Sequence, residues 1–257
     1  AGLSFGDWTA DQITRTLCDL YAQIMEKKPW IKVSSAPLGL YSQDRYPGYP
    51  SSYLYGRTKC YQDAQGWLAA GAQDFIVPQI YWADPPYRST TPHFSEVLPA
   101  WVTHSAHRHV YAGQSQTVTG PELVHEIAVT RSMWSYGAQG NCVFSFSNFD
   151  ANGYWAYYSS AFGAPYAARA ELPDMPWKTN PTTGIIIGNV TGPDGSTPVV
   201  DARITRSGST YTALSSGDGL YSFLLVPPGT YTVTCSDPRS GTRQFVGVEV
   251  EAGQVKR

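Results

Sequence analysis

Apolar residues along the first two-thirds of the chain follow a helical spacing that alternates with continuous runs. A helix over 9–28 is predicted by apolar positions three and four residues apart, which is the spacing of one helix face. These positions are Ile13, Leu17, Leu20 and Ile24. Thr9 and Gln12 fit a capping box, and Pro29 would stop the helix. The chain therefore opens with an amphipathic helix.

Four continuous apolar runs behind this helix predict buried strands, with a helical pattern between each pair. The strands are expected at 30–37, 74–82, 109–114 and 141–149, and the helices at 61–71, 93–104 and 120–134. Strands that are apolar throughout belong to a parallel sheet covered by helices. A closed eight-stranded barrel takes roughly 250 residues. We therefore expect about four βα units, or half of a (β/α)8 TIM-type barrel.

The pattern changes after a proline-rich stretch over 168–184. From 185 onward, short strand patterns are separated by turn signals about every ten residues, which predicts a small all-β sandwich. The predicted domains are a partial barrel over 1–178 and a sandwich over 179–257. A fragment of 183–257 is expected to fold alone, since domains of that size often do.

Charge and composition exclude some classes of protein. The net charge is −2, so the basic footprint of a nucleic-acid binder is missing. No apolar run approaches the roughly 20 residues of a membrane-spanning helix. The four cysteines have no metal-ligand spacing, and we expect them to be free and mostly buried. The histidines of HSAHRH precede a strand and so fall at the amino-terminal face of the sheet. The sequence thus predicts no metal site and no cofactor.

Two resemblances to known families rest on longer motifs. The segments CYQDAQGWLAAGAQDFIVPQIYW, VYAGQS and GAQGNCVFSFSNF, in this order and spacing, resemble the C-terminal half of the family-ten-like glycosylhydrolases, which are exported bacterial proteins with a TIM barrel. The stretch GNVTGPDGSTPVVDARIT resembles the carboxypeptidase regulatory-like module, a transthyretin-like sandwich of secreted bacterial proteins. The resemblance implies an extracellular, periplasmic or cell-surface location, with the export signal upstream of this chain.

The first resemblance also implies a missing part. An Asp-Asp-Tyr motif at the end of the family's fourth strand has no equivalent here. We therefore expect the first half of the barrel, and at least one catalytic carboxylate, to lie upstream. Four parallel strands would leave an inner face that includes Val33, Ile76 and Val143 or their neighbours. Either the upstream half-barrel or a second copy should pack on that face.

The candidate site residues follow from the strand ends, because substrates of parallel barrels lie at the carboxyl ends of the strands. Aromatic faces cover the apolar side of a sugar ring, while amides and hydroxyls bond to its hydroxyl groups. The candidates for substrate binding are Tyr41, Gln79, Tyr81, Trp82, Gln114, Gln116 and Asn148. Tyr81 and Trp82 have the alternative of packing under the next loop.

Glycoside hydrolysis generally needs two carboxyl groups. Asp84, two residues past a strand end, is the first candidate for a catalytic residue, Asp150 the second and Asp44 the third. Each of these aspartates has the alternative of a turn residue.

Three functions remain open. The first is part of an exported glycoside hydrolase that acts on a polysaccharide or on peptidoglycan glycan, with this chain inactive alone. The second is a non-catalytic carbohydrate-binding or cell-surface scaffold protein. The third is an adhesion protein in which only the sandwich matters, and it predicts no sugar affinity in residues 1–180.

Overall fold

The fold is described by a computed structural model that covers residues 2–115, 119–160 and 164–257. The predicted site residue Gln116 lies outside these ranges. Two compact units are present. The first comprises residues 1–13, 32–69 and 73–174, and the second comprises residues 14–31, 70–72 and 175–257.

The first unit is a parallel α/β region, as predicted. Its sheet has the strand order β1-β2-β3-β4, and every neighbouring pair is parallel. The pairing extends past β2, because Gln79 bridges both Leu38 and Gly113. The sheet strands and the larger elements between them are β1 (Ser34–Ser35), α3 (Ala64–Ala69), β2 (Phe75–Ile76), α4 (Phe94–Thr103), β3 (His109–Ser115), α5 (Gly120–Ser132), β4 (Ala138–Phe144) and α6 (Phe146–Ala151). Shorter turns of helix are η1 (Gln43–Arg45), α2 (Gly56–Lys59), η2 (Trp134–Tyr136) and η3 (Ala156–Ser160).

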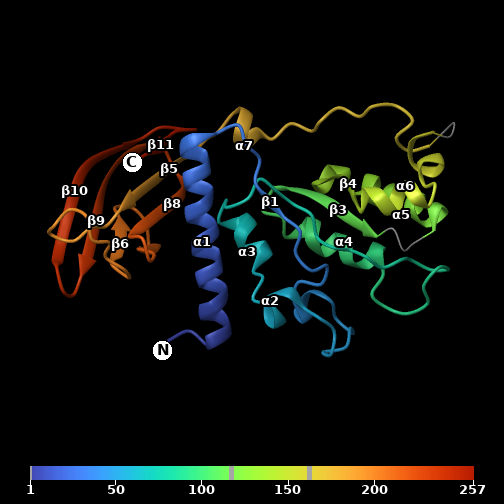
Figure 1. The fold of residues 1–257 in the computed structure, drawn as a ribbon, viewed down its shortest axis with the longest axis horizontal. Helices are drawn as coiled ribbons and strands as arrows, with labels where there is room; N and C mark the ends of the chain where they lie inside the picture. The colour runs from blue at the N-terminus through green and yellow to red at the C-terminus, as the bar shows by residue number, and fades with distance from the viewer. Residues whose placement is uncertain (1, 116–118, 161–163) are drawn as a thin grey trace. The chain divides into compact units, whose positions relative to one another are not determined.

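One face of this sheet is covered by α4 and α5 (Figure 1). The predicted apolar face of α4 is confirmed as buried: it consists of Phe94, Val97, Leu98, Trp101 and Val102. Under the helices, Ile76 and Val110 are fully buried, and Val143 packs with Leu123 and Phe149.

The opposite face of the sheet is the one that the sequence analysis expects to line the inside of a barrel. Of the residues expected there, Ile76 and Val143 face the helices instead, because successive side chains of a strand point to opposite faces. Their neighbours Phe75 and Phe144 take the inner side. The Phe75 ring meets Tyr111 edge-on with the centroids 5.2 Å apart, and Phe144 is 61% exposed. The inner face is therefore aromatic and open.

Two predicted element boundaries were wrong. Helix α1 (Phe5–Lys27) begins before Thr9, whose hydroxyl donates to the Phe5 carbonyl inside the helix. Ser4 starts it instead: its Oγ accepts a hydrogen bond from the Asp7 N–H and donates to the Asp7 carboxylate. The last strand ends at Phe144, and the residues after it form α6.

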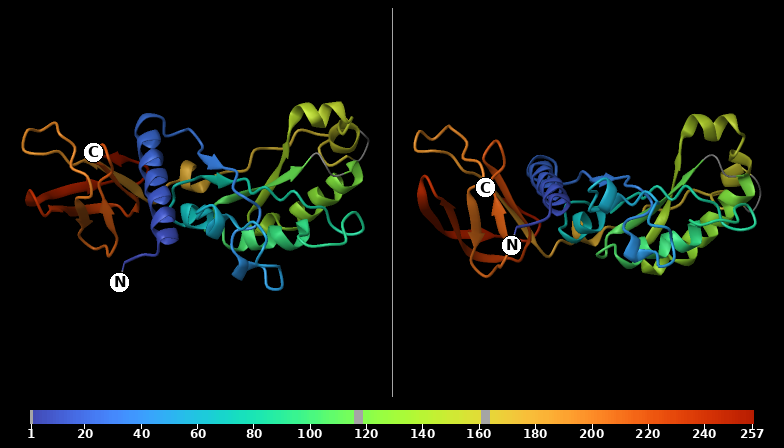
Figure 2. Two further views of the ribbon diagram at one scale, coloured as in Figure 1. Left: turned by 60° about the horizontal axis from the view of Figure 1, so that its bottom comes forward. Right: turned by 90° about the horizontal axis from the view of Figure 1, so that it is seen from below.

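The second unit contains a β-sandwich, also as predicted. Its sheets have the orders β10-β9-β6-β7 and β11-β5-β8, and Figure 2 shows them from two further sides. The strands are β5 (Gly184–Asn189), β6 (Arg203–Arg206), β7 (Thr212–Leu214), β8 (Leu220–Val226), β9 (Gly229–Asp237), β10 (Gly241–Val250) and β11 (Val255–Lys256). A short helix, α7 (Pro176–Thr179), precedes them. The register of β10 on β9 shifts between Phe245 and Val248.

Helix α1 contributes to this second unit from Thr14 onward. Ala22 is fully buried against Ile187 and Leu220 of the sandwich. Near the end of the helix, Glu26 accepts hydrogen bonds from the Arg257 guanidinium. The sandwich therefore includes a helix that lies far from its strands in the sequence.

The four cysteines, all within the described ranges, form no disulfide, as predicted, but they are not buried: Cys142 is exposed and the other three are half-buried. Cys142 follows the alternation of β4 and so shares the open inner face with Phe144. Within the described ranges, no helix has the length and apolar character needed to cross a membrane.

Candidate functional site

The predicted site residues at the ends of β1 and β2 lie at the carboxyl edge of the parallel sheet. Gln79 Nε2 donates a 2.7 Å hydrogen bond to the Ala36 carbonyl, which fixes the amide between neighbouring strand ends. Tyr41 contacts the residue that precedes α3. Its hydroxyl donates to Asp63 over 2.5 Å, and burial, followed by this contact, raises the pKa of Tyr41.

An aromatic pair occupies the inner side of the same edge. The rings of Tyr81 and Phe144 stack with their centroids 6.4 Å apart and their planes 20° apart. Tyr81 follows the last bridged residue of the β2 segment, and Phe144 ends β4. Trp82 is half-buried against the backbone of Gly39, where a Cβ would come within 2.7 Å of its ring.

Asp84 is the centre of a buried polar cluster that we call the Asp84 cluster. It comprises Asp84, Gln114, Glu122, His125 and Glu126. Both carboxylate oxygens of Asp84 are occupied. Oδ1 accepts from the backbone N–H and hydroxyl of Ser95, in the first turn of α4, and Oδ2 lies 2.9 Å from His125 Nε2. A carboxylate at a helix amino terminus is stabilised by the helix dipole. Asp84 is only 3% exposed.

Helix α5 supplies Glu122, His125 and Glu126 of the Asp84 cluster, and strand β3 supplies Gln114. Thr119 caps the helix, and Pro121 occupies its first turn. Glu122 Oε1 accepts from the Asp84 N–H over 2.7 Å. One turn later, Glu126 Oε2 accepts from Gln114 Nε2 over 2.8 Å. The helix thereby connects the end of β3, at Gln114, with the loop after β2, at Asp84.

Burial controls the protonation of the two glutamates. Both Glu122 and Glu126 are 0% exposed. Burial raises the pKa of Glu126 to about 9, against the effect of the Gln114 hydrogen bond, and the charges of Glu122 and Asp84 add to the rise. Burial also raises the pKa of Glu122. His125 is different, because 45% of its side chain is exposed. The Asp84 cluster therefore combines two buried glutamates whose pKa values are raised with an imidazole that solvent can reach.

Two further predicted site residues, Asp150 and Asn148, are placed elsewhere. Asp150 and Asn148 lie on α6, since the strand that was expected to carry them ends at Phe144. Asp150 accepts a hydrogen bond from Trp155 Nε1, and the Asn148 side chain is 3.4 Å from Ser145 Oγ. Asp84 and Gln114 are thus joined through α5, and neither α6 residue belongs to this network.

Glu122, His125, Glu126 and Phe144 were not among the predicted residues. A signal for the glutamates was present in GPELVHEIAVT: Glu122, Glu126 and Thr130 are spaced four apart and flank Leu123 and Ile127. Acidic residues on the buried face of a helix are rare unless they are partnered. That pattern identifies a buried polar network.

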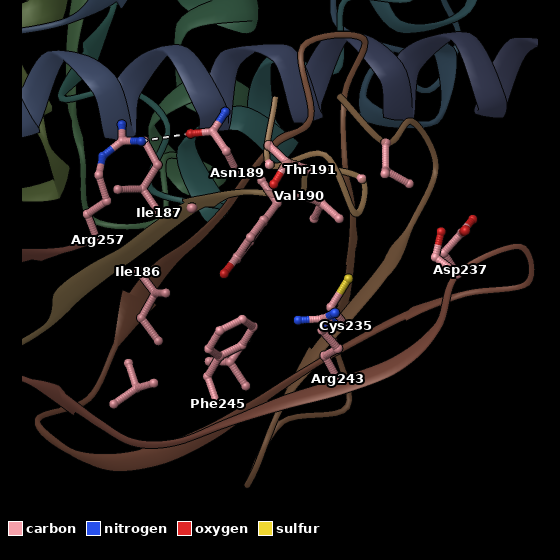
Figure 3. Close-up of a pocket in the computed structure, with 18 of the residues that line it drawn as sticks. Ile186, Ile187, Asn189, Val190, Thr191, Cys235, Asp237, Arg243, Phe245 and Arg257 are labelled. Carbon is pink, nitrogen blue, oxygen red and sulfur yellow. Dashed lines mark hydrogen bonds between the residues drawn. The ribbon is translucent and has the colours of Figure 1, made fainter. Parts of the chain in front are cut away.

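A cavity of about 620 Å³ is present in the sandwich (Figure 3). Strands of both sheets line it, with apolar Ile186 and Phe245 on its walls and Arg243 among its polar groups. At its rim, Arg257 Nη1 donates to Asn189 Oδ1 over 2.7 Å. Its walls are mainly apolar, in contrast to the Asp84 cluster.

Comparison with known families agrees with both motif resemblances. Residues 3–127 match Glycosyl hydrolase-like 10, and residues 185–257 match the Carboxypeptidase regulatory-like domain. The glycosyl hydrolase YngK of Bacillus subtilis (strain 168) is 23% identical over 190 residues, which cover 68% of this chain and 36% of YngK. The chain therefore spans about a third of that relative's length.

Two solved structures are similar at a coarser level. An endo-beta-1,4-mannanase from Thermotoga petrophila is 11% identical with a TM-score of 0.40, and the match covers 98% of this chain and 63% of the mannanase chain. A type II cohesin–X-dockerin complex from Acetivibrio cellulolyticus is 26% identical with a TM-score of 0.23, over 28% of this chain and 50% of the other.

Proposed function

We propose that this chain, which joins a glycosyl hydrolase-like 10 region to a carboxypeptidase regulatory-like domain, is part of an exported bacterial glycoside hydrolase that acts on a polysaccharide. Peptidoglycan glycan is one substrate within this proposal. The sandwich is a spacer or adhesion module, and the protein works outside the cytoplasm, at the cell surface or in the periplasm.

The stacked pair of Tyr81 and Phe144 is the observation that carries this proposal. Both rings lie at the carboxyl ends of parallel strands, and Phe144 is 61% exposed on the inner face. Aromatic rings at this position suit the apolar face of a sugar, and the neighbouring Gln79 amide suits its hydroxyl groups. The chemistry of this edge is that of a carbohydrate site.

Catalysis requires a completed barrel in this proposal. The inner face with Phe75 and Tyr111 would be covered by further barrel strands, which would leave Phe144 open at the carboxyl edge and would also bring a second carboxyl group. Asp84 stays a candidate for the other carboxyl group. Its burial and its two occupied oxygens mean that it would have to be uncovered, or act through His125, when substrate binds.

These same features of Asp84 favour a second candidate function, a carbohydrate-binding protein without hydrolytic activity. A carboxylate that caps α4 and contacts His125 is fully used in stabilising the fold. The two functions share the sugar-binding edge and differ only in whether bonds are cleaved.

Binding of glycans to the purified chain tests the shared part of the proposal. Glycan strands released from peptidoglycan and a panel of neutral oligosaccharides are the probes for calorimetry. We expect Tyr81→Ala and Phe144→Ala each to weaken binding by about 1–3 kcal/mol, the value of one buried aromatic side chain. Tyr136→Ala is the matched control, because Tyr136 is 72% exposed but precedes β4 at the opposite end of the sheet.

Absence of glycan binding, or equal losses in all three variants, would reject the carbohydrate site. Hydrolysis is then measured with a longer protein in which further barrel strands complete the sheet. Product release that Asp84→Asn abolishes supports the hydrolase. Binding without any product release supports the carbohydrate-binding alternative.

A further inference from the structure

The Asp84 cluster concentrates acidic groups without a matching cation. Asp84, Glu122 and Glu126 are all at most 3% exposed. Within residues 2–115, 119–160 and 164–257, their ion pairs include no lysine or arginine, and His125 is the basic group in contact. Buried carboxylates are costly unless they are paired, protonated or bound to a metal.

One oxygen of the cluster points to a missing ligand. Glu122 Oε1 accepts from the Asp84 N–H, but Glu122 Oε2 is fully buried and has no hydrogen-bond partner among the described residues. Buried polar atoms of this kind are rare in native structures and indicate an unaccounted ion or water. Because Glu122 is 0% exposed, bulk solvent does not reach this atom, and an ion or a buried water has to supply its partner.

The donor atoms are placed as a metal would need them. One ligand atom each from Asp84, Glu122 and His125 can be chosen so that all three lie within 4.8 Å of one another. Donors around a tetrahedral zinc ion, at bond lengths of about 2.0–2.2 Å, are separated by roughly 3.3–3.6 Å. The upper bound of 4.8 Å on the present separations is therefore about 1.2–1.5 Å wider than the spacing of zinc ligands.

We propose that Asp84, Glu122 and His125 bind a divalent zinc ion. Two carboxylates and one imidazole form a ligand set that zinc accepts, whereas calcium and magnesium prefer oxygen ligands alone. Three protein ligands would leave a fourth position for a further ligand. The proposal differs from the expectation of no metal that the sequence motifs suggest.

The zinc ion would connect two segments of the sheet edge. Asp84 belongs to the loop between β2 and α4, while Glu122 and His125 lie in the first two turns of α5. In the absence of metal, two hydrogen bonds join these segments: one from the Asp84 N–H to Glu122 Oε1, and one between His125 and Asp84. Replacing the His125–Asp84 contact by three metal–ligand bonds would hold the loop and the helix together and thereby stabilise the folded unit.

Zinc binding by the full chain tests this inference independently of any activity on glycans. Calorimetry with Zn²⁺ and thermal unfolding with and without Zn²⁺ are measured on the intact chain, on Glu122→Gln and on His125→Ala. Glu122→Gln keeps the size of the side chain, and His125 is exposed, so both variants are expected to fold. Circular dichroism checks this. Glu96→Gln is the matched control, since Glu96 lies 3.5 Å from His93 in a more exposed pair.

We expect one zinc ion per chain, a higher melting temperature with zinc, and at least a tenfold loss of affinity in Glu122→Gln and in His125→Ala. Glu96→Gln should bind zinc like the unaltered chain. The free cysteines are alternative zinc ligands. Zinc binding that is unchanged in both cluster variants would therefore overturn the proposal, as would a complete lack of zinc binding.

Discussion

Ser222 donates a 2.6 Å hydrogen bond to Asp19, although 203 residues separate the two in the sequence. The bond joins helix α1 to strand β8 inside the second unit. Asp19 is 9% exposed, and burial raises its pKa to about 6, against the effect of the Ser222 hydrogen bond. The contact is therefore sensitive to pH.

The pKa of Asp19 predicts how the stability of the second unit changes with pH. A folded pKa of about 6 lies above the ordinary value of 3.8, so the folded state binds the proton more tightly. This stabilisation is complete below about pH 4 and is lost as the pH rises through 6, with a size on the order of 2–3 kcal/mol. Asp19→Asn should remove this pH dependence, as measured by urea unfolding from pH 4 to 8.

Asp194→Asn is the control of opposite sign. Hydrogen bonds from Thr197 and Ser196 lower the pKa of Asp194, so its stabilisation is lost as the pH falls. Asp194→Asn should therefore lose stability mainly above pH 4. It should keep the decline in the free energy of unfolding that the deprotonation of Asp19 causes between pH 4 and 6. An Asp19→Asn protein with the same decline as the unaltered chain would contradict the assignment.

The sandwich should be weaker without its helix. A fragment of residues 183–257 leaves Ile187 and Leu220 exposed where Ala22 now covers them. Exposure of a buried aliphatic side chain costs roughly 1.5–3 kcal/mol. We expect this fragment to unfold cooperatively but at a lower melting temperature than the second unit of the intact chain. Addition of a peptide of residues 14–31 should raise it.

The same peptide with Ala22→Glu serves as the control for that effect, because a charge at this fully buried position prevents docking. Equal melting temperatures with either peptide would show that the helix does not support the sandwich.

Gly39→Ala should destabilise the first unit. A Cβ at this position would lie 2.3 Å from the Gln79 carbonyl oxygen and 2.7 Å from the Trp82 ring, and the backbone oxygen cannot move aside. We expect a loss of about 1–3 kcal/mol, the usual cost of overpacking, in chemical unfolding. Gly217→Ala is the control, since a Cβ there meets nothing within 4 Å. A loss in both variants would point to a general effect of removing glycine.

Trp82→Ala should weaken glycan binding by roughly 1–3 kcal/mol with little change in melting temperature, if the indole stacks on a sugar. Trp134→Ala is the comparison, because Trp134 is 64% exposed and precedes β4. A large drop in melting temperature with unaltered binding would assign Trp82 to packing against Gly39.

The sequence pattern was sufficient to predict which segments are helices and which are strands, because the spacing of apolar residues shows which side chains are buried. The apolar face of α4 and the alternation of strands and helices are local properties. The faces of β2 and β4 were less certain. A shift of one residue exchanges the two faces of a strand, so the sequence left open whether Ile76 and Val143 or their neighbours form the inner face, and the structure places Ile76 and Val143 on the side of the helices.

The Asp84 cluster required three-dimensional information. Asp84 was selected by its position after a strand, but its partners Glu122 and His125 lie 38 and 41 residues away. The spacing of Glu122 and Glu126 suggests a polar stripe, yet nothing local shows that Asp84 meets it. Likewise, the amphipathic pattern of α1 identifies a buried face without saying which domain covers it.

The shift in register between Phe245 and Val248 affects how the sandwich meets other proteins. Strand β10 is at the end of its sheet, and Val246 on it is 77% exposed. An uninterrupted apolar edge is a template for adding strands from other chains. The bulge, with Gly247 at φ +72°, bends the edge partway along, so an incoming strand would find matching backbone groups over only part of its length. This protects the module from edge-to-edge aggregation at high concentration.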